Sequence, residues 1–150
     1  MPEFQPHIPK FRASPGRLSI IEATLLLLLA RLVMRLGGLT QACRVLRLQP
    51  GALPASPTIP TEVDAARRVA ASMARARNIV GQAGDCLPQC LAAAAMLRRR
   101  GVSPTLHFAV AKSQSDAAHL YAHAWLAVGE EDVTGGGDSS GLIELQRPAS

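Results

Sequence analysis

Aromatic side chains are scarce in this sequence, which has one Trp, one Tyr and three Phe among 150 residues. Apolar residues nevertheless make up 48% of the chain, so the core has to be built mostly from aliphatic side chains. This composition excludes a disordered chain and a collagen-like chain. The length fits one domain, or one domain with an appendage, around a sizeable core.

Cysteine is also scarce, with Cys43, Cys86 and Cys90 as the only three. An odd number argues against the disulfide framework of a small secreted protein. The first residues, MPEFQPHIPKF, lack the apolar stretch of a signal peptide. The most apolar run, residues 23–30, ends at charged residues on both sides and is too short to cross about 30 Å of hydrocarbon. We therefore expect a soluble, cytoplasmic protein, with contact at a membrane surface as the lesser alternative.

Charge is unevenly distributed along the chain. Residues 1–100 carry fourteen basic and five acidic residues, whereas residues 101–150 carry two basic and six acidic residues. A basic first part suits nucleic acid or an acidic peptide or protein. The charge distribution alone leaves both kinds of partner open.

The first predicted helix spans residues 20–36, with Ser19 as its cap and Glu22 at the capping-box spacing. Gly37 and Gly38 end it, and a short second helix follows from residue 39 to 46 or 48. The leucines of the first helix leave a wide apolar surface, while Arg31 and Arg35 share one narrow face. Two interpretations stay open: the surface packs on the protein's own core, or part of it docks a partner.

Prolines then divide the chain, because four of them lie between residues 49 and 60. Proline fixes φ and removes a hydrogen-bond donor, which favours an extended linker. The predicted organisation is an N-terminal arm and helical appendage over residues 1–48, a linker over residues 49–60, and a domain over residues 61–150.

Two further helices are predicted in that domain. One starts at Thr61 with Glu62 and Asp64 in its first turn. In the other, Asp85 caps a helix rich in Ala and Leu, and Gly101 ends it. Because alanines allow close approach of other elements, we expect this last helix to be the central one.

Apolar alternation then changes to a period of two, which predicts strands. They lie at residues 105–110, 119–128, 132–134 and 142–145, with a turn at residues 129–131. Helices followed by an antiparallel meander define an α+β fold.

Cys86 is the best candidate nucleophile, because it lies in the first turn of the central helix. Unpaired backbone N–H groups and the positive end of the helix dipole favour a thiolate there, and the same N–H groups can stabilise an oxyanion. Among the histidines, His123 is best placed as the base, since it lies in mid-strand beside Trp125. An inert buried thiol remains the simpler interpretation of Cys86.

Zinc binding is a rival interpretation. Cys86 and Cys90 lie four residues apart, as do His119 and His123. Residues four apart on a strand are separated by roughly 13 Å, however, so the two histidines cannot share one ion. We expect no metal and no cofactor.

Several runs together resemble the lasso peptide leader peptidases, which are transglutaminase-like maturation proteases. They are CLPQCL at 86–91, LRRRG at 97–101, LHFAV at 106–110, AHAWL at 122–126 and VTGG at 133–136. Their order and spacing are kept over about residues 78–147. The Leu- and Arg-rich N-terminal helices also resemble the stand-alone form of that family.

This resemblance implies a papain/transglutaminase-like core in which a nucleophile at a helix start faces a sheet that carries the histidine. It assigns Cys86 as nucleophile and His123 as base and then acid. The family's third residue, an Asp, has no direct match, because its place falls near Thr134 and Gly135. Asp138 is the slightly preferred substitute and Asp132 the other, while a backbone carbonyl or a water could also orient the ring.

The implied reaction is cleavage of the leader from a ribosomally made lasso peptide precursor, which frees the core's N-terminus for an asparagine-synthetase-like cyclase. The implied partners are the precursor, that cyclase and a separate PqqD-like recognition protein, with no nucleic acid among them. A non-catalytic scaffold that docks leader and cyclase is the alternative. Cys90 departs from the family pattern, in which a hydroxyl residue is common, and burial as a small apolar side chain accounts for it.

Overall fold

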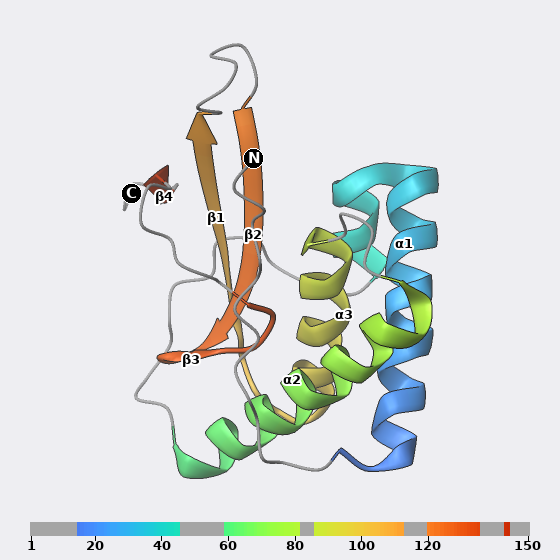
Figure 1. Ribbon diagram of the computed structural model, residues 1–150, viewed down its shortest axis with the longest axis vertical. Helices are drawn as coiled ribbons and strands as arrows, with labels where there is room; N and C mark the ends of the chain where they lie inside the picture. The colour runs from blue at the N-terminus through green and yellow to red at the C-terminus, as the bar shows by residue number, and fades with distance from the viewer. Residues whose placement is uncertain (1–14, 46–58, 82–85, 113–119, 136–142, 145–150) are drawn as a thin grey trace.

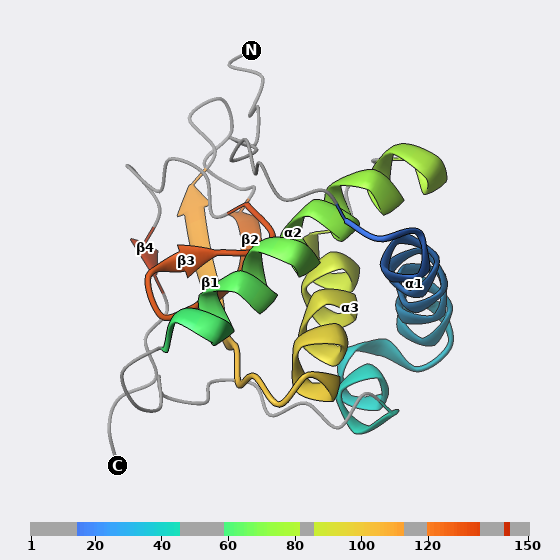
Figure 2. The same cartoon turned by 90° about the horizontal axis from the view of Figure 1, so that it is seen from below.

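The computed structural model describes residues 15–45, 59–81, 86–112, 120–135 and 143–144. Three helices come first, and they are α1 (Arg17–Val45), α2 (Pro60–Val80) and α3 (Cys86–Arg99). The strands β1 (Thr105–Lys112), β2 (Leu120–Val128), β3 (Glu131–Asp132) and β4 (Ile143–Glu144) follow. Figures 1 and 2 both show α3 between the sheet and α1, with α2 crossing beside it. The predicted α+β class and the central place of the third helix are confirmed.

Helix α1 begins earlier than predicted. The backbone N–H groups of Ser19 and Ile20 donate to the Gly16 carbonyl oxygen at 3.0 and 3.2 Å. Ser19 therefore lies inside the first turn, and its assignment as the cap is wrong. The predicted break is confirmed at Gly38, whose φ of 68° and ψ of −171° interrupt the helix before it continues to Val45.

The inner face of α1 belongs to the main core. Ala23 and Leu27 are fully buried in one cluster with Val69 of α2, Met96 of α3 and Leu126 of β2. Helix α1 therefore shares its core with the elements that follow it. The domain boundaries at 48 and 61 stay a prediction, and most of the expected linker lies outside the described residues.

Helix α2 starts at Pro60, one residue before the predicted start. Proline suits this position because its missing N–H would be unpaired there in any case. The Glu62 carboxylate accepts a hydrogen bond from the Ile59 N–H at 3.2 Å, which satisfies one of the free donors at the helix start. Further along, Arg67 forms an ion pair with Glu131 at 3.0 Å and so links α2 to β3.

Helix α3 is buried from Pro88 to Leu97, and alanines make up much of this stretch. Its end is the predicted one: Gly101 has a φ of 76°, and the Val102 N–H donates to the Leu97 carbonyl oxygen at 3.0 Å. This is the hydrogen bond of a glycine-terminated helix. Firm packing around α3 fixes where its first residue, Cys86, lies.

The sheet is antiparallel with the order β3-β2-β1-β4, so it is not the predicted meander. In a meander, β4 would pair with β3, but it pairs with β1 through Ala109 opposite Glu144. Strand β4 covers the far edge of β1 at Ala109 and Val110, and both outer strands, β3 and β4, are only two residues long. The turn is also shorter than predicted, because β3 starts at Glu131, opposite Val128.

Candidate active site

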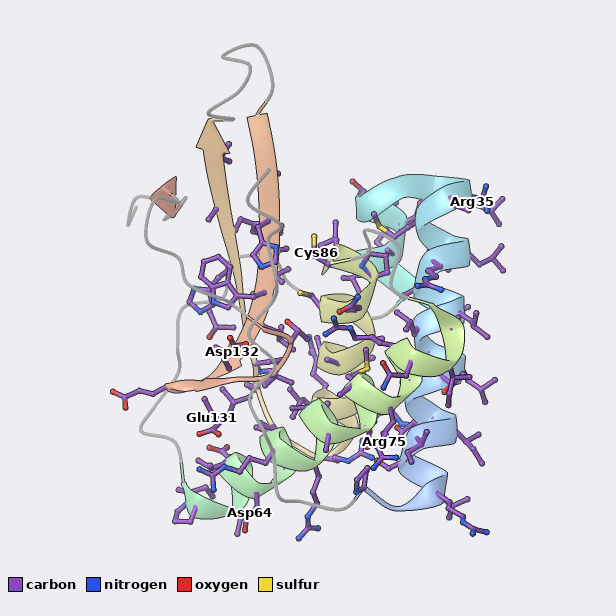
Figure 3. The ribbon with its side chains drawn as sticks, in the orientation of Figure 1. Arg35, Asp64, Arg75, Cys86, Glu131 and Asp132 are labelled. Carbon is purple, nitrogen blue, oxygen red and sulfur yellow. The ribbon has the colours of Figure 1, made fainter. Side chains whose placement is uncertain are left out.

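Cys86 is the first residue of α3, and its side chain is partly exposed. Figure 3 shows it at the start of the helix, next to β2. The expected place in the first turn is therefore confirmed, while Asp85, the expected cap, lies outside the described residues. A thiol at this end of a helix is exposed to the positive end of the dipole.

Helix α3 contacts the outer edge of β2 at Ala124. Strand β3 pairs with β2 only at Ala127 and Val128, and the Val133 N–H then donates to the Leu126 carbonyl oxygen at 2.8 Å. On the same edge of β2, before Leu126 in the chain, the contacts come from α3. The Cys90 thiol donates to the Ala124 carbonyl oxygen at 3.4 Å, and the Ala124 backbone also hydrogen-bonds the Cys86 thiol.

Two cysteines one helical turn apart therefore contact the backbone of the residue that follows His123. This contact fixes the height of Cys86 relative to the strand.

His123 lies on β2 with only 7% of its surface exposed, and its side chain is hydrogen-bonded to the Cys86 thiol. The ring atom Nε2 lies 3.3 Å from the Gly135 carbonyl oxygen. A proton on Nε2 donated to that carbonyl leaves Nδ1 as the basic nitrogen that can take the Cys86 proton. The structure thus brings together the two residues that the sequence singled out.

The pKa values of the pair shift in opposite directions. The pKa of Cys86 is lowered, chiefly by its hydrogen bond with His123 and against the effect of burial. The pKa of His123 is raised, chiefly by its hydrogen bond with Cys86, again against burial. Both shifts favour a thiolate beside an imidazolium, which is the form that attacks a carbonyl carbon.

Asp132 acts on the histidine through Gly135. Its Oδ1 accepts a hydrogen bond from the Gly135 N–H at 2.8 Å, in a turn where Gly135 has a φ of 91°. That turn places the Gly135 carbonyl at His123, and the Asp132 charge also contributes to raising the pKa of His123. Asp138, the preferred candidate, lies outside the described residues. Among the described residues, the group bonded to Nε2 is a backbone carbonyl.

Cys90 has a different environment from Cys86, although it lies on the same helix face. It is fully buried, and burial raises its pKa to about 12. Its sulfur lies 3.4 Å from the Thr134 hydroxyl, which in turn accepts the Leu126 N–H at 2.9 Å. Cys90 and Thr134 therefore hold the segment after β3 against β2.

The part of the chain that the structure describes contains no group of three or more His, Cys, Asp or Glu residues placed to hold a metal ion. His119, which the zinc interpretation requires, is not among these residues.

His107 is a neighbour of the site to which sequence reasoning gave no role. It lies opposite Trp125 in the β1–β2 register, and the two rings stack with centroids 5.1 Å apart. Trp125 in turn stacks on His123 at 6.0 Å. Alternation along the two strands places all three on one face, but only the register shows that His107 meets Trp125. The stack covers one side of the His123 ring.

No helix among the described residues is long and apolar enough to span a membrane. No curated protein and no solved structure shows a significant match to the chain. Residues 24–144, however, match the transglutaminase-like superfamily, so the match includes most of α1 as well as the Cys86–His123 site. A match over this much of the chain, together with a cysteine at a helix start facing a histidine on an antiparallel sheet, shows that the protein belongs to the transglutaminase-like superfamily.

Proposed function

We propose that this protein is a cysteine endopeptidase that removes the leader from a ribosomally made lasso peptide precursor. The observation that carries the proposal is the hydrogen-bonded Cys86–His123 pair, in which the pKa of the thiol is lowered and that of the imidazole is raised. The pair needs no cofactor to cleave a peptide bond. The choice of substrate rests on the sequence runs around these residues, which resemble the lasso peptide leader peptidases.

In the first half of the reaction, the Cys86 thiolate attacks the scissile carbonyl carbon and a tetrahedral oxyanion forms. Backbone N–H groups at the start of α3 are the nearest candidates to stabilise that oxyanion. The His123 imidazolium gives its proton to the leaving nitrogen, and the C–N bond breaks. The products are the free amine of the core peptide and a thioester between Cys86 and the leader.

In the second half, neutral His123 takes a proton from a water molecule, whose oxygen attacks the thioester carbon. The C–S bond breaks, the leader leaves as a carboxylic acid, and the Cys86 thiolate and His123 imidazolium are restored. Because His123 exchanges protons in both halves, its ring has to keep one orientation. The Gly135 carbonyl provides a hydrogen-bond acceptor for that purpose. The family usually orients this ring with an Asp carboxylate, for which Asp138 or Asp132 is the substitute in this chain.

The partners follow from the same proposal. The free N-terminus would go to an asparagine-synthetase-like cyclase, which joins it to an acidic side chain of the core. A separate PqqD-like protein would present the leader. Both are expected protein partners, and the reaction takes place in the cytoplasm.

The test is a cleavage assay with purified protein, precursor and recognition protein, in which the products are weighed by mass spectrometry. We expect one cut between leader and core, and no cut with Cys86→Ala. Cleavage by Cys86→Ala at the parental rate would refute the proposal. In a producing cell, undiminished mature peptide with Cys86→Ser would instead favour the scaffold.

A further inference from the structure

The outer face of α1 carries an apolar stripe that the fold leaves uncovered. Its six members are at least 45% exposed, and they are Leu18, Ile21, Leu25, Leu28, Leu32 and Leu36. Figures 1 and 2 show α1 at the outer margin of the molecule, with α2 and α3 on its other side. We call these six residues the outer stripe.

The protein's own core does not account for the outer stripe. Ala23, Leu27 and Ala30 are fully buried, and they lie on the opposite side of the helix. Helix α1 is therefore apolar on two sides, and among the described residues only the inner side packs against other elements. A contiguous exposed apolar surface of this kind marks a site of interaction.

The spacing within the outer stripe is that of a helix–helix seam. From Leu18 to Leu32 its members alternate at steps of three and four residues, which is the pattern that interlocks with a second helix. Helices that lie on a membrane surface usually combine Trp or Phe with Leu on the apolar face and carry Lys and Arg on a polar opposite face. The outer stripe has no aromatic residue, and the face opposite it is buried in the core. The pattern thus favours a helix over a lipid surface.

The charges along one edge of the outer stripe indicate which charge a partner helix would carry. Arg17 and Arg35 are exposed, and eighteen residues, or about five turns, separate them, so they lie on the same edge. Neither has an ion pair with a described residue. Figure 3 shows Arg35 pointing away from the molecule. On the other edge, Glu22 is neutralised by Arg99 at 3.3 Å and Arg100 at 2.7 Å.

A second copy of the chain does not suit this arrangement. An antiparallel pair of outer stripes brings Arg17 of one copy near Arg35 of the other. A parallel pair brings the arginine edge of each copy against the other edge of its partner, where Arg99 and Arg100 outnumber Glu22. Both arrangements place like charges side by side, which opposes association.

We propose that the outer stripe binds an amphipathic helix of a partner protein, with acidic residues along one flank of that helix. The leucines supply most of the affinity, and Arg17 and Arg35 set orientation and association rate. This inference is independent of the proposed peptidase activity.

Arg31 shares a narrow helix face with Arg35 but does not present its charge at the edge of the outer stripe. Its guanidinium donates to the carbonyl oxygens of Val80 and Gly81 at 3.2 and 2.8 Å, which ties α1 to the end of α2. Replacing Arg31 would therefore perturb the fold, so the test uses Arg17 and Arg35.

The test measures binding of two labelled synthetic helices to the full chain by fluorescence anisotropy. Both helices have about four heptads with Leu at the a and d positions. One carries Glu and the other Lys at the flanking positions, and like charges keep each from pairing with itself. We expect the Glu helix to bind at least about tenfold more tightly at low salt and to lose this advantage as salt is added.

Matched variants assign the binding to the stripe. Leu25→Ser combined with Leu32→Ser should abolish it, while Ile79→Ser, at a site 66% exposed on α2, should leave it unchanged. Arg17→Gln combined with Arg35→Gln should remove the preference for the Glu helix, while Arg75→Gln on α2 should not. Because these side chains are exposed, the thermal midpoint should stay nearly constant.

Four results would overturn the proposal. Equal binding of both helices, or binding that survives the Leu25 and Leu32 changes, would separate the interaction from the stripe. A dimer in sedimentation that the same changes dissociate would identify a second copy as the occupant. Binding to phosphatidylglycerol vesicles without binding to either helix would identify a lipid surface.

Discussion

The first two turns of α3 carry the same residue type on the same face, yet their thiols have opposite character. Cys86 is partly exposed and bonded to His123, and its pKa is lowered. Cys90 is fully buried beside a hydroxyl and a carbonyl, and its pKa is raised to about 12. The helix dipole alone does not explain the contrast. A charged partner and access to solvent decide which thiol can become a nucleophile.

Removing one sulfur at a time tests this contrast most directly. Cys86→Ala should slow precursor cleavage by at least about 10³-fold, because the nucleophile is lost. Cys90→Ala should stay within about tenfold of the parent and lower the free energy of unfolding by about 1–2 kcal/mol, because a buried sulfur and its hydrogen bond are lost. Cleavage rates and urea unfolding measure the two effects. Equal loss of activity in both variants would contradict the assignment of Cys86 alone as nucleophile.

The pH dependence of kcat/KM should form a bell set by the Cys86–His123 pair. Below the pKa of Cys86 the sulfur is protonated and does not attack, and this limb should lie below the ordinary range of a thiol because that pKa is lowered. Above the pKa of His123 the leaving amine receives no proton, and this limb should lie above the ordinary range of an imidazole because that pKa is raised.

Each limb should fall about tenfold per pH unit. Alkylation by iodoacetamide provides the control: the rate at Cys86 should rise with pH along the acid limb, as the thiolate forms, and Cys90 should react only after unfolding. An acid limb in the ordinary thiol range would show that the pair does not form.

Asp132 should contribute less than Cys86, because it reaches His123 through Gly135. Asp132→Ala removes the acceptor of the Gly135 N–H and should slow cleavage about tenfold. Asp132→Asn keeps an acceptor oxygen and should stay within about threefold of the parent. If the two variants are equally slow, the charge of Asp132 rather than its hydrogen bond matters. Asp138→Asn belongs in the same assay, since a loss near 10⁴-fold would identify it as the orienting carboxylate.

The smallest expected effect concerns Thr134. Its hydroxyl lies between Cys90 of α3 and the backbone of β2. Thr134→Val removes the acceptor of the Leu126 N–H and the neighbour of the Cys90 sulfur. Leaving a partly buried donor unpaired should lower the free energy of unfolding by about 1–2 kcal/mol, with little change in cleavage rate. Thr134→Ser keeps the hydroxyl and should restore most of the stability. Thermal or urea unfolding of the two variants measures the difference, and equal stability would show that the hydroxyl has no structural role.

Predictions from the sequence were most accurate where the signal is local. Gly38 and Gly101 mark the helix ends that their backbone freedom favours. The α+β class followed from helical spacing followed by alternation. The start of α1 was misplaced because Ser19 has the right residue type for a cap, while the chain upstream of it already continues the helix from Gly16.

The candidate site was predictable only in part. Helix position and strand alternation singled out Cys86 and His123, because both signals lie within one element each. The roles of Gly135, Thr134 and the Ala124 backbone were not predictable, since each depends on how the segment after β3 meets β2. His107 was missed for the same reason, because its partner Trp125 comes from another strand.

By itself, then, the sequence determined where α1 is interrupted and where α3 ends, which strand faces are apolar, and which cysteine lies at a helix start. These properties depend on dihedral preference and on side-chain period, which act over a few residues. Only the tertiary structure decided that β4 returns to β1, that a backbone carbonyl meets His123, and that the pKa values of Cys86 and Cys90 shift in opposite directions. Those properties depend on strand register and on burial between distant segments, and no stretch of the sequence specifies either of them alone.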